Sequence, residues 1–349
     1  MDIRYKLSQR TLHFKRPART SRGEYTEHDT IIVLITDEDG KRIGLGECAP
    51  LPDLSYDRNA YACLSDVDKL INDALKSEDY HEFLRPYPAL LFAIESAMND
   101  YQQNPFLYDT PFALGKEGIP INGLIWMADY ENMRNQVEDK LQQNSRCIKI
   151  KIGAINWEDE LLLIRNIRAH YSNDIIQIRV DANGNFTPEE VMPRLEELAK
   201  YDIHSIEQPI QQCQWKEMAK LCKNSPIPIA LDEELIGINT VEEKQEVLDI
   251  IKPQYIVVKP TLHGGITGAL EWIDEAKKRN IDSWITSALE GNIGLLSVAL
   301  LAARAYGPNI TFPQGLGTGQ LFVDNIDMGL RIKDNKLWRI NTNDSRRIP

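Results

Sequence analysis

From residue 121 to residue 313, short apolar runs alternate with longer stretches in which apolar residues recur at helical spacing. This alternation predicts eight strands, at 121–126, 147–152, 176–181, 205–207, 228–232, 255–259, 282–286 and 311–313. It predicts seven helices between them, near 130–144, 157–170, 188–201, 214–223, 240–251, 265–279 and 292–305. Strict alternation favours a parallel sheet, and units of roughly 25–30 residues favour a closed TIM-like barrel. An open doubly wound sheet stays an alternative, although no Gly-x-Gly-x-x-Gly follows the first strand.

The two ends of the chain lack this alternation. Residues 1–115 contain a predicted hairpin around Asp37–Gly40 and helical patterns at 59–76 and 88–102, which indicates a separate α+β domain. Proline and glycine cluster through 104–120, so we expect the barrel to occupy residues 116–313. Residues 314–349 are mostly non-periodic, and we expect them to return and pack on the N-terminal domain.

The charge balance excludes some partners. The 349 residues include 40 Lys and Arg against 52 Asp and Glu, a net charge of -12, whereas nucleic acid binding needs a basic face. No apolar run approaches the roughly 18 residues that span a bilayer, and the first sixteen residues lack the apolar centre of a secretory signal. The five cysteines are scattered and read as reduced thiols. We therefore expect a cytoplasmic protein that acts on a small molecule.

Charged residues end five successive predicted strands. They are Lys149 with Lys151, Asp181, Glu207, Asp232 and Lys259. Because the carboxyl ends of barrel strands form one ring, these side chains are expected to meet in one pocket. A helix cap or a surface salt bridge is the simpler explanation for any single strand-end acid. The recurrence of charge at the ends of five successive strands favours a functional site instead.

The residue types indicate a particular chemistry. Asp181, Glu207 and Asp232 would repel one another in a buried pocket unless a hard divalent cation such as Mg²⁺ neutralised them. Lys149 and Lys151 are two apart on one strand and point to the same side, so their repulsion is expected to lower each other's pKa. A neutral lysine is a competent general base, and such a site could remove a proton next to a substrate carboxylate.

These residues and their neighbours resemble the enolase superfamily, in its muconate-lactonizing subgroup. The matching motifs are CIKIKIG (147–153), RVDANG (179–184), IEQPI (206–210), ALDEEL (230–235) and VVKPTLHGG (257–265). The segment 44–57 is similar to the capping-domain loop that closes over the substrate, with 51–56 as candidate contacts. The segments 286–294 and 314–322 are similar to the last barrel strands of the o-succinylbenzoate synthase family.

The resemblance implies a capping domain, formed from both chain ends, on a (β/α)₇β barrel. It implies that Asp181, Glu207 and Asp232 hold Mg²⁺, which binds a small anionic carboxylate substrate. It further implies that Lys151 is the general base and that Lys259 stabilises an enediolate from the opposite side.

The resemblance also suggests roles for further residues. Lys149 is expected to orient or tune the site, and Arg179 to contact the substrate. Ser287 and Gly315 match positions that hold a succinyl tail. The implied reaction removes water from 2-succinyl-6-hydroxy-2,4-cyclohexadiene-1-carboxylate and yields 2-succinylbenzoate, an intermediate of menaquinone synthesis.

The same lysines and acids could also catalyse other reactions, and these alternatives stay open. Racemisation of N-succinylamino acids and epimerisation of dipeptides need a lysine on each face, which Lys151 and Lys259 could supply. Dipeptide epimerases usually carry Asp-x-Asp at the last strand, where this chain reads FPQGLGTGQ (312–320). Muconate cycloisomerisation is a weaker alternative, and a mandelate-type histidine base is not expected of His263. A barrel scaffold without catalysis is disfavoured, because it would not need all three acids and both lysines.

Overall fold

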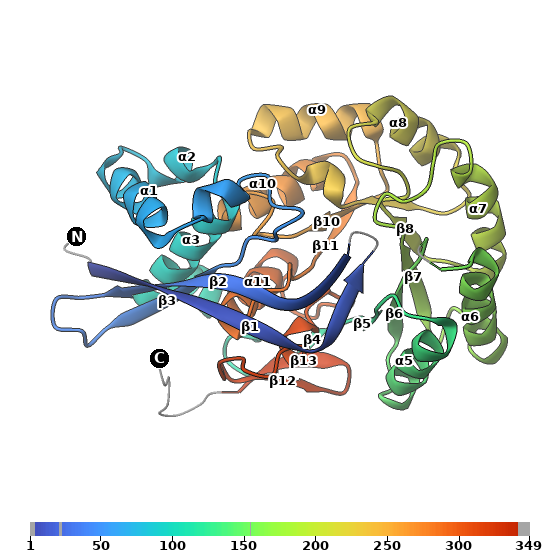
Figure 1. Ribbon diagram of the computed structural model, residues 1–349, viewed down its shortest axis with the longest axis horizontal. Coiled ribbons are helices and arrows are strands. Elements are labelled where there is room, and N and C mark those ends of the chain that lie inside the picture. The colour runs from blue at the N-terminus through green and yellow to red at the C-terminus, as the bar shows by residue number, and fades with distance from the viewer. Residues whose placement is uncertain (1–3, 21–22, 154, 341–349) are drawn as a thin grey trace.

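A sheet of seven parallel strands curls through the centre of the molecule (Figure 1). The structure, a computed structural model, describes residues 4–20, 23–153 and 155–340. In space the strands follow the order β11-β10-β9-β8-β7-β6-β5, with every neighbouring pair parallel. Their bounds are β5 (Gly123–Ile125), β6 (Cys147–Lys151), β7 (Gln177–Asp181), β8 (Ser205–Glu207), β9 (Ile229–Leu231), β10 (Tyr255–Val258) and β11 (Asp282–Ile285). All seven carboxyl ends therefore lie at one rim.

Two single parallel bridges close this sheet into a ring. Gln314 pairs with Ile121, just ahead of β5, and Gly315 pairs with Thr286, just after β11. The fold is therefore an α/β barrel in which one short extended segment takes the place of an eighth strand. The predicted strand at 311–313 is wrong by a few residues, because its last residue is a proline without an N–H to donate.

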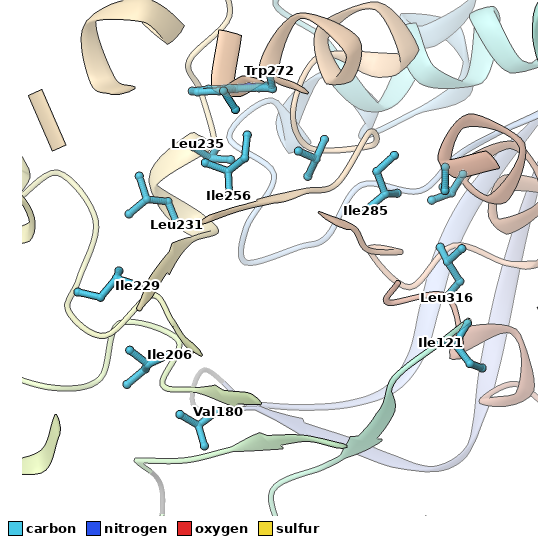
Figure 2. Close-up of a cluster of buried hydrophobic side chains, with 14 of the residues drawn as sticks. Ile121, Val180, Ile206, Ile229, Leu231, Leu235, Ile256, Trp272, Ile285 and Leu316 are labelled. Atoms are coloured by element: carbon cyan, nitrogen blue, oxygen red, sulfur yellow. The ribbon is translucent and has the colours of Figure 1, made fainter. Parts of the chain in front are cut away.

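Seven helices follow the seven strands and cover the outside of the ring (Figure 1). Their bounds are α5 (Tyr130–Gln142), α6 (Trp157–His170), α7 (Val191–Leu198), α8 (Trp215–Asn224), α9 (Val241–Ile251), α10 (Gly265–Lys278) and α11 (Asn292–Tyr306). Each lies within a few residues of its predicted stretch. Figure 2 shows apolar side chains such as Val180, Ile206 and Ile285 pointing outward from the strands, into the core that the ring shares with the helices. Over the described residues, no helix is long and apolar enough to cross a membrane.

An N-terminal lobe, residues 4–108, packs beside the barrel (Figure 1). It consists of β1 (Arg4–Thr20), β2 (Gly23–Thr36), β3 (Ile43–Cys48), η1 (Arg58–Tyr61), α1 (Leu64–Lys76), α2 (Tyr80–Leu84), α3 (Pro88–Gln102) and α4 (Pro105–Tyr108). The predicted hairpin at 37–40 is confirmed, since β2 and β3 pair across it. The predicted helix at 59–76 is instead η1 followed by α1, with an extended residue before α1. Gly44 and Gly46 let α3 approach β3, because a Cβ there would lie 2.1 Å and 1.9 Å from carbonyl oxygens of α3.

The C-terminal residues contact both parts of the molecule. Three short strands form a sheet of order β12-β13-β4 beside the start of the barrel. Their bounds are β4 (Ile119–Pro120), β12 (Leu330–Lys333) and β13 (Lys336–Arg339). Ahead of this sheet, Phe322 forms a bridge with Phe14 of the N-terminal lobe. The chain therefore touches the N-terminal lobe on its way to a hairpin on the barrel side, and residues 341–349 lie outside the described residues.

Candidate active site

Six charged side chains, at or directly after the ends of five strands, meet at the carboxyl rim of the barrel. They are Lys149, Lys151, Asp181, Glu207, Asp232 and Lys259. A cavity with about 1240 Å³ of open space, which includes its mouth, is lined by both β6 lysines, Asp181 and Lys259. Glu207 and Asp232 lie beneath this surface, with 3% and 0% of each residue exposed. The structure thus brings together all six residues that the strand-end spacing singled out.

The two β6 lysines point into the ring because the side chains of a strand alternate, so that Ile150 between them faces the helices. Lys149 Nζ donates to Glu207 Oε1 at 2.6 Å and lies 2.9 Å from Asp181 Oδ2. Lys151 Nζ donates to Asp181 Oδ2 at 3.0 Å. Asp181 therefore lies between two lysine side chains, and Lys149 bridges the acids of two neighbouring strands.

Lys259 lies across the ring from Lys151. On one side of the ring, three strands (β7, β8 and β9) separate β6 from β10. On the other side, β5, the closing segment formed by Gln314 and Gly315, and β11 separate them. The Lys259 ammonium donates to Asp232 Oδ2. The side chain of Lys259 is 12% exposed and that of Lys151 is 9% exposed. Two amines therefore open on one cavity from opposite sides.

Burial and neighbouring charges shift the pKa values of this cluster in different directions. Burial lowers the pKa of Lys149, but Asp181, Glu207 and Asp232 outweigh it and raise that pKa. Burial and the charge of Asp181 raise the pKa of Glu207. Lys149 and Lys151 overcome the effect of burial and lower the pKa of Asp181. The expected lowering of the Lys149 pKa is therefore wrong for this arrangement, because the partners in contact with its ammonium are carboxylates.

Asn183 and Glu233 extend the cluster, although the spacing of the strand ends does not point to them. Lys151 Nζ donates to Asn183 Oδ1 at 2.7 Å, and Asn183 Nδ2 donates to Glu233 Oε1 at 3.0 Å. Asn183 has a φ of 46°, in the left-handed region that asparagine tolerates. Both residues line the cavity. Their positions within two residues of a strand-end acid are the signal that could have found them.

His263 supports the backbone at Lys259. Its Nδ1 accepts a hydrogen bond from the Lys259 N–H at 3.0 Å, so the ring proton of the neutral imidazole lies on Nε2. Burial lowers the pKa of His263 to about 3, which keeps the ring neutral near pH 7. His263 therefore holds the turn after β10 in place.

Arg179 lies below the cavity rather than in its wall. It is 2% exposed, and its guanidinium carbon lies 4.4 Å from the ring centroid of Trp284 and 4.3 Å from that of Phe312. Its Nη1 donates to the carbonyl of Pro313 at 3.0 Å. Among the described residues, those that line the cavity do not include Arg179. This location does not support the expected contact with a substrate.

Ser287 and Gly315 line the cavity on the side away from the acids. The Ser287 hydroxyl donates to buried Glu290 and accepts from Thr318 Oγ1 at 2.7 Å. The Gly315 N–H donates to the carbonyl of Ile285 at 2.9 Å, and its carbonyl accepts from the Ser287 N–H at 3.0 Å. Both residues therefore form the wall of the cavity, with most of their hydrogen-bonding groups already engaged.

The N-terminal lobe covers part of the cavity. Tyr25, Leu51 and Leu54 line it, the last two from the loop that follows β3. Tyr56, the last residue of the candidate contact segment 51–56, does not line the cavity. Its hydroxyl donates to the carbonyl of Pro86 in the N-terminal lobe at 2.7 Å. The leucines therefore give the cover an apolar inner surface.

Two buried glutamates of the N-terminal lobe hold it against barrel helices. Glu47 of β3 accepts from the N–H groups of Gly291 and Gly294 at 2.8 Å each, at the start of α11. Glu95 of α3 accepts from the N–H of Thr267 at 3.2 Å, at the start of α10. Helix amino termini favour carboxylates, so the lobe is fixed on the two helices that follow β10 and β11.

The three strand-end acids offer the donor set of a hard divalent cation. Asp181, Glu207 and Asp232 are buried carboxylates on adjacent strands, and such oxygens are the ligands that Mg²⁺ takes in proteins. Asp232 Oδ1 is buried without a hydrogen-bond partner among the described residues. Within the same part of the chain, no three acidic, histidine or cysteine side chains are arranged to hold a metal ion, and the acids contact lysines instead. The three carboxylates and the unpartnered Asp232 Oδ1 fit Mg²⁺ in donor chemistry, while in this structure the acids are turned toward the lysines.

Fold and site together define the class of this protein: it is an α/β-barrel enzyme whose lysines and carboxylates meet at the carboxyl ends of the strands. A model of the family described as Enolase C-terminal domain-like matches residues 132–337. The chain belongs to this family.

Three matches to known proteins each cover nearly the whole chain. The o-succinylbenzoate synthase of Desulfotalea psychrophila is 42% identical, over 95% of this chain and 97% of that protein. The crystal structure of MenC from Desulfotalea psychrophila matches with a TM-score of 0.77 at 36% identity, covering 96% of this chain and 99% of that one. The dipeptide epimerase of Enterococcus faecalis has a TM-score of 0.82 at 21% identity and 98% coverage of both chains, which shows a shared fold.

Proposed function

We propose that the chain is an o-succinylbenzoate synthase. The reaction removes water from 2-succinyl-6-hydroxy-2,4-cyclohexadiene-1-carboxylate and yields 2-succinylbenzoate, an intermediate of menaquinone synthesis. The observation that carries the proposal is the 42% identity to a synthase over 95% of the chain. The buried lysines at the strand ends supply the acid–base groups that this reaction needs.

We assign Lys151 as the general base. Asp181 Oδ2 and Asn183 Oδ1 accept hydrogen bonds from its amine. A neutral amine has two hydrogens and one lone pair, so two such bonds leave the lone pair for the cavity. Lys151 takes the proton from the carbon next to the substrate carboxylate. The C–O bond on the same face then breaks, the ring gains a double bond, and the Lys151 ammonium returns the proton to the departing hydroxide, which leaves as water.

Lys259 and Lys149 support this step without taking the proton. Lys259, held by Asp232, approaches the substrate from the opposite side and places a positive charge beside the enediolate. Lys149 lies two residues deeper on β6 and bridges Asp181 and Glu207, so it fixes the position of the acids.

We infer that Asp181, Glu207 and Asp232 hold Mg²⁺. When bound there, the ion supplies a Lewis acid for the reacting carboxylate of the substrate. The support is the burial of three carboxylates on adjacent strands, together with the unpartnered Asp232 Oδ1 among the described residues.

The remaining features fit an enzyme of this kind. We propose that the barrel is of the (β/α)₇β type and that residues 1–115 and 314–349 form its capping domain, with Leu51 and Leu54 excluding water from the site. The substrate is a small anionic carboxylate, and cytoplasm is the expected location because the five cysteines are free thiols.

Ultraviolet assays test the proposal. The purified protein with Mg²⁺ should convert the cyclohexadiene substrate to 2-succinylbenzoate, which is followed by the absorbance change as the ring becomes aromatic. N-succinylamino acids and the dipeptide L-Ala-L-Glu are tested beside it by polarimetry. Turnover of only these latter compounds would replace the synthase with a racemase or an epimerase on the same lysines.

A further inference from the structure

Gln208 comes directly after the strand-end acid Glu207 and is completely buried. Its backbone has a φ of 38°, in the left-handed region, although Pro209 follows and favours extended backbone at the residue before it. A residue with a side chain keeps such a conformation only where its surroundings fix it. The described residues that line the cavity do not include Gln208, so its place in the fold is set by its hydrogen bonds rather than by a substrate.

The backbone of Gln208 connects β8 to both neighbouring strands at the height of the acids. Its N–H donates to the carbonyl of Ala230 in β9 at 2.9 Å. Its carbonyl accepts from the N–H of Gly184 at 2.7 Å, in the turn that follows β7. The rim segments on either side of β8 are therefore joined through this one residue.

The side chain of Gln208 reaches the turn after β9. Its Oε1 accepts from the N–H groups of Asp232 at 3.1 Å and Glu234 at 3.2 Å. Its Nε2 donates to the carbonyl of Ile210 at 3.0 Å and to Glu234 Oε2 at 3.3 Å. An amide has two acceptor positions and two donor hydrogens, so all four are used. A reversed amide would set its NH₂ group against two N–H groups, so the orientation of the side chain is fixed.

Gln208 thus contacts the backbone beside each of the three strand-end acids. It is the next residue in the chain after Glu207, its carbonyl holds the turn that follows Asp181, and its side-chain oxygen holds the N–H of Asp232. Carboxylates brought together in a buried site repel one another, so their spacing has to be held by other groups. An amide does this without adding a charge.

We propose that Gln208 is a positioning residue that fixes the backbone of Asp232 relative to Glu207 and thereby sets the affinity of the three acids for Mg²⁺. The inference rests on the proposed function, in which these acids hold the ion. Loss of a group that holds metal ligands in place weakens metal binding by about 10- to 100-fold in other proteins. Gln208 acts through the ligands and does not touch the substrate.

Calorimetric titration of Mg²⁺ into the EDTA-treated full chain tests this role. Gln208→Asn keeps an amide and tolerates the left-handed backbone, but it is one methylene shorter, so its oxygen no longer reaches the Asp232 N–H. The Kd for Mg²⁺ should rise about tenfold or more.

Gln314→Asn is the matched control. Gln314 is also completely buried, and its amide accepts from the N–H of Ile285 and donates to the carbonyl of Phe312, both at 2.8 Å. It belongs to the closing segment, on the opposite side of the ring from β8. Both variants should lose stability in urea, because each leaves a buried N–H without its partner, but Gln314→Asn should leave the Kd for Mg²⁺ unchanged.

A second pair of variants covers the case in which the shortened side chain prevents folding. Gln208→Met and Gln314→Met fill nearly the original volume and remove every polar atom of the side chain. The same split is expected, with weaker Mg²⁺ binding in the Gln208 variant only. Turnover of the cyclohexadiene at increasing Mg²⁺ gives a further measure, since the Gln208 variants should need a higher Mg²⁺ concentration for half-maximal rate.

The outcomes separate the inference from the proposed function. If folded Gln208 variants bind Mg²⁺ as tightly as wild type, the role of Gln208 is overturned while the synthase and its metal site stand. Equal weakening of Mg²⁺ in the Gln208 and Gln314 variants would also overturn it, in favour of a general contribution to stability. If the wild-type protein binds no Mg²⁺, the proposed metal site fails, and the inference fails with it.

Discussion

Lys151 and Lys259 face each other across the barrel, and a different carboxylate holds each amine. Lys151 contacts Asp181 and Lys259 contacts Asp232. The two amines therefore approach a substrate from opposite faces. Dehydration with removal and return of the proton on one face needs acid–base chemistry from one lysine only, whereas racemisation needs it from both. The pair thus offers a direct way to separate the two activities.

Substitution of Lys151 should abolish dehydration. In Lys151→Ala the proton acceptor is lost, and we expect kcat to fall roughly a thousandfold or more, the scale of general acid–base catalysis. The ultraviolet assay measures kcat, and circular dichroism checks the fold. Lys252→Ala, on the exposed end of α9, is the control and should keep full activity. Retention of more than a few per cent by Lys151→Ala would contradict the assigned role.

Lys259 should tolerate a change that keeps its charge. Lys259→Arg retains a cation beside Asp232, so it should keep more dehydration activity than Lys259→Met, by about tenfold or more. An arginine cannot deprotonate, so any racemisation of N-succinylamino acids should disappear in both variants. Equal loss of dehydration in the two variants would argue that Lys259 exchanges a proton rather than supplying a charge.

Metal removal should stop turnover reversibly. Chelation with EDTA should abolish dehydration, and added Mg²⁺ should restore it, because three buried carboxylates are proposed to hold the ion. Asp232→Asn removes one anionic ligand and should weaken Mg²⁺ at least tenfold in a calorimetric titration. Asp249→Asn, an exposed acid on α9, should leave the Mg²⁺ affinity unchanged. Full activity in EDTA would rule out the metal.

Much of the fold could be predicted because the barrel repeat has a fixed period. Each strand–helix unit spans a similar length, so Lys151, Asp181 and Glu207 fall at the same height in successive strands. Alternation along a strand also places Lys149 and Lys151 on the same side. Both regularities can be seen in the sequence, and together they place the site residues at the carboxyl rim of the barrel.

Other features depend on neighbours that are far apart in the chain. The resemblance suggests that Arg179 contacts the substrate, but rings from distant segments, Trp284 and Phe312, enclose its guanidinium below the cavity. The orientation of the Ser287 hydroxyl depends on Glu290, and the direction of the Lys149 pKa shift depends on which carboxylates touch it. Spacing along the chain does not encode these contacts.

Arg179 should affect stability more than substrate binding. Arg179→Lys keeps the charge but loses the stacking on two rings and the fit to the Pro313 carbonyl, so we expect the free energy of unfolding to fall by about 2 kcal/mol. Urea unfolding measures this loss. The KM of the surviving folded enzyme should stay within about twofold of wild type, since Arg179 lies outside the cavity wall. A large rise in KM with unchanged stability would instead support the substrate contact that the sequence suggested.

Glu47 should make stability depend on pH. Burial, opposed by the N–H groups of Gly294 and Gly291 and assisted by Glu290, raises the pKa of Glu47 from 4.5 to about 7. Between these values the folded chain holds a proton that the unfolded chain has lost, so stability falls as pH rises from 4.5 to 7 and levels off above. A shift of this size corresponds to about 3 kcal/mol.

Glu47→Gln cannot ionise, so the wild-type free energy of unfolding minus that of the variant should decrease by about this amount from pH 4.5 to pH 8. Urea unfolding across this range measures the difference, with the exposed Glu196→Gln as control. A difference that does not change with pH would show that Glu47 is ionised throughout the range and that its helix contacts outweigh its burial.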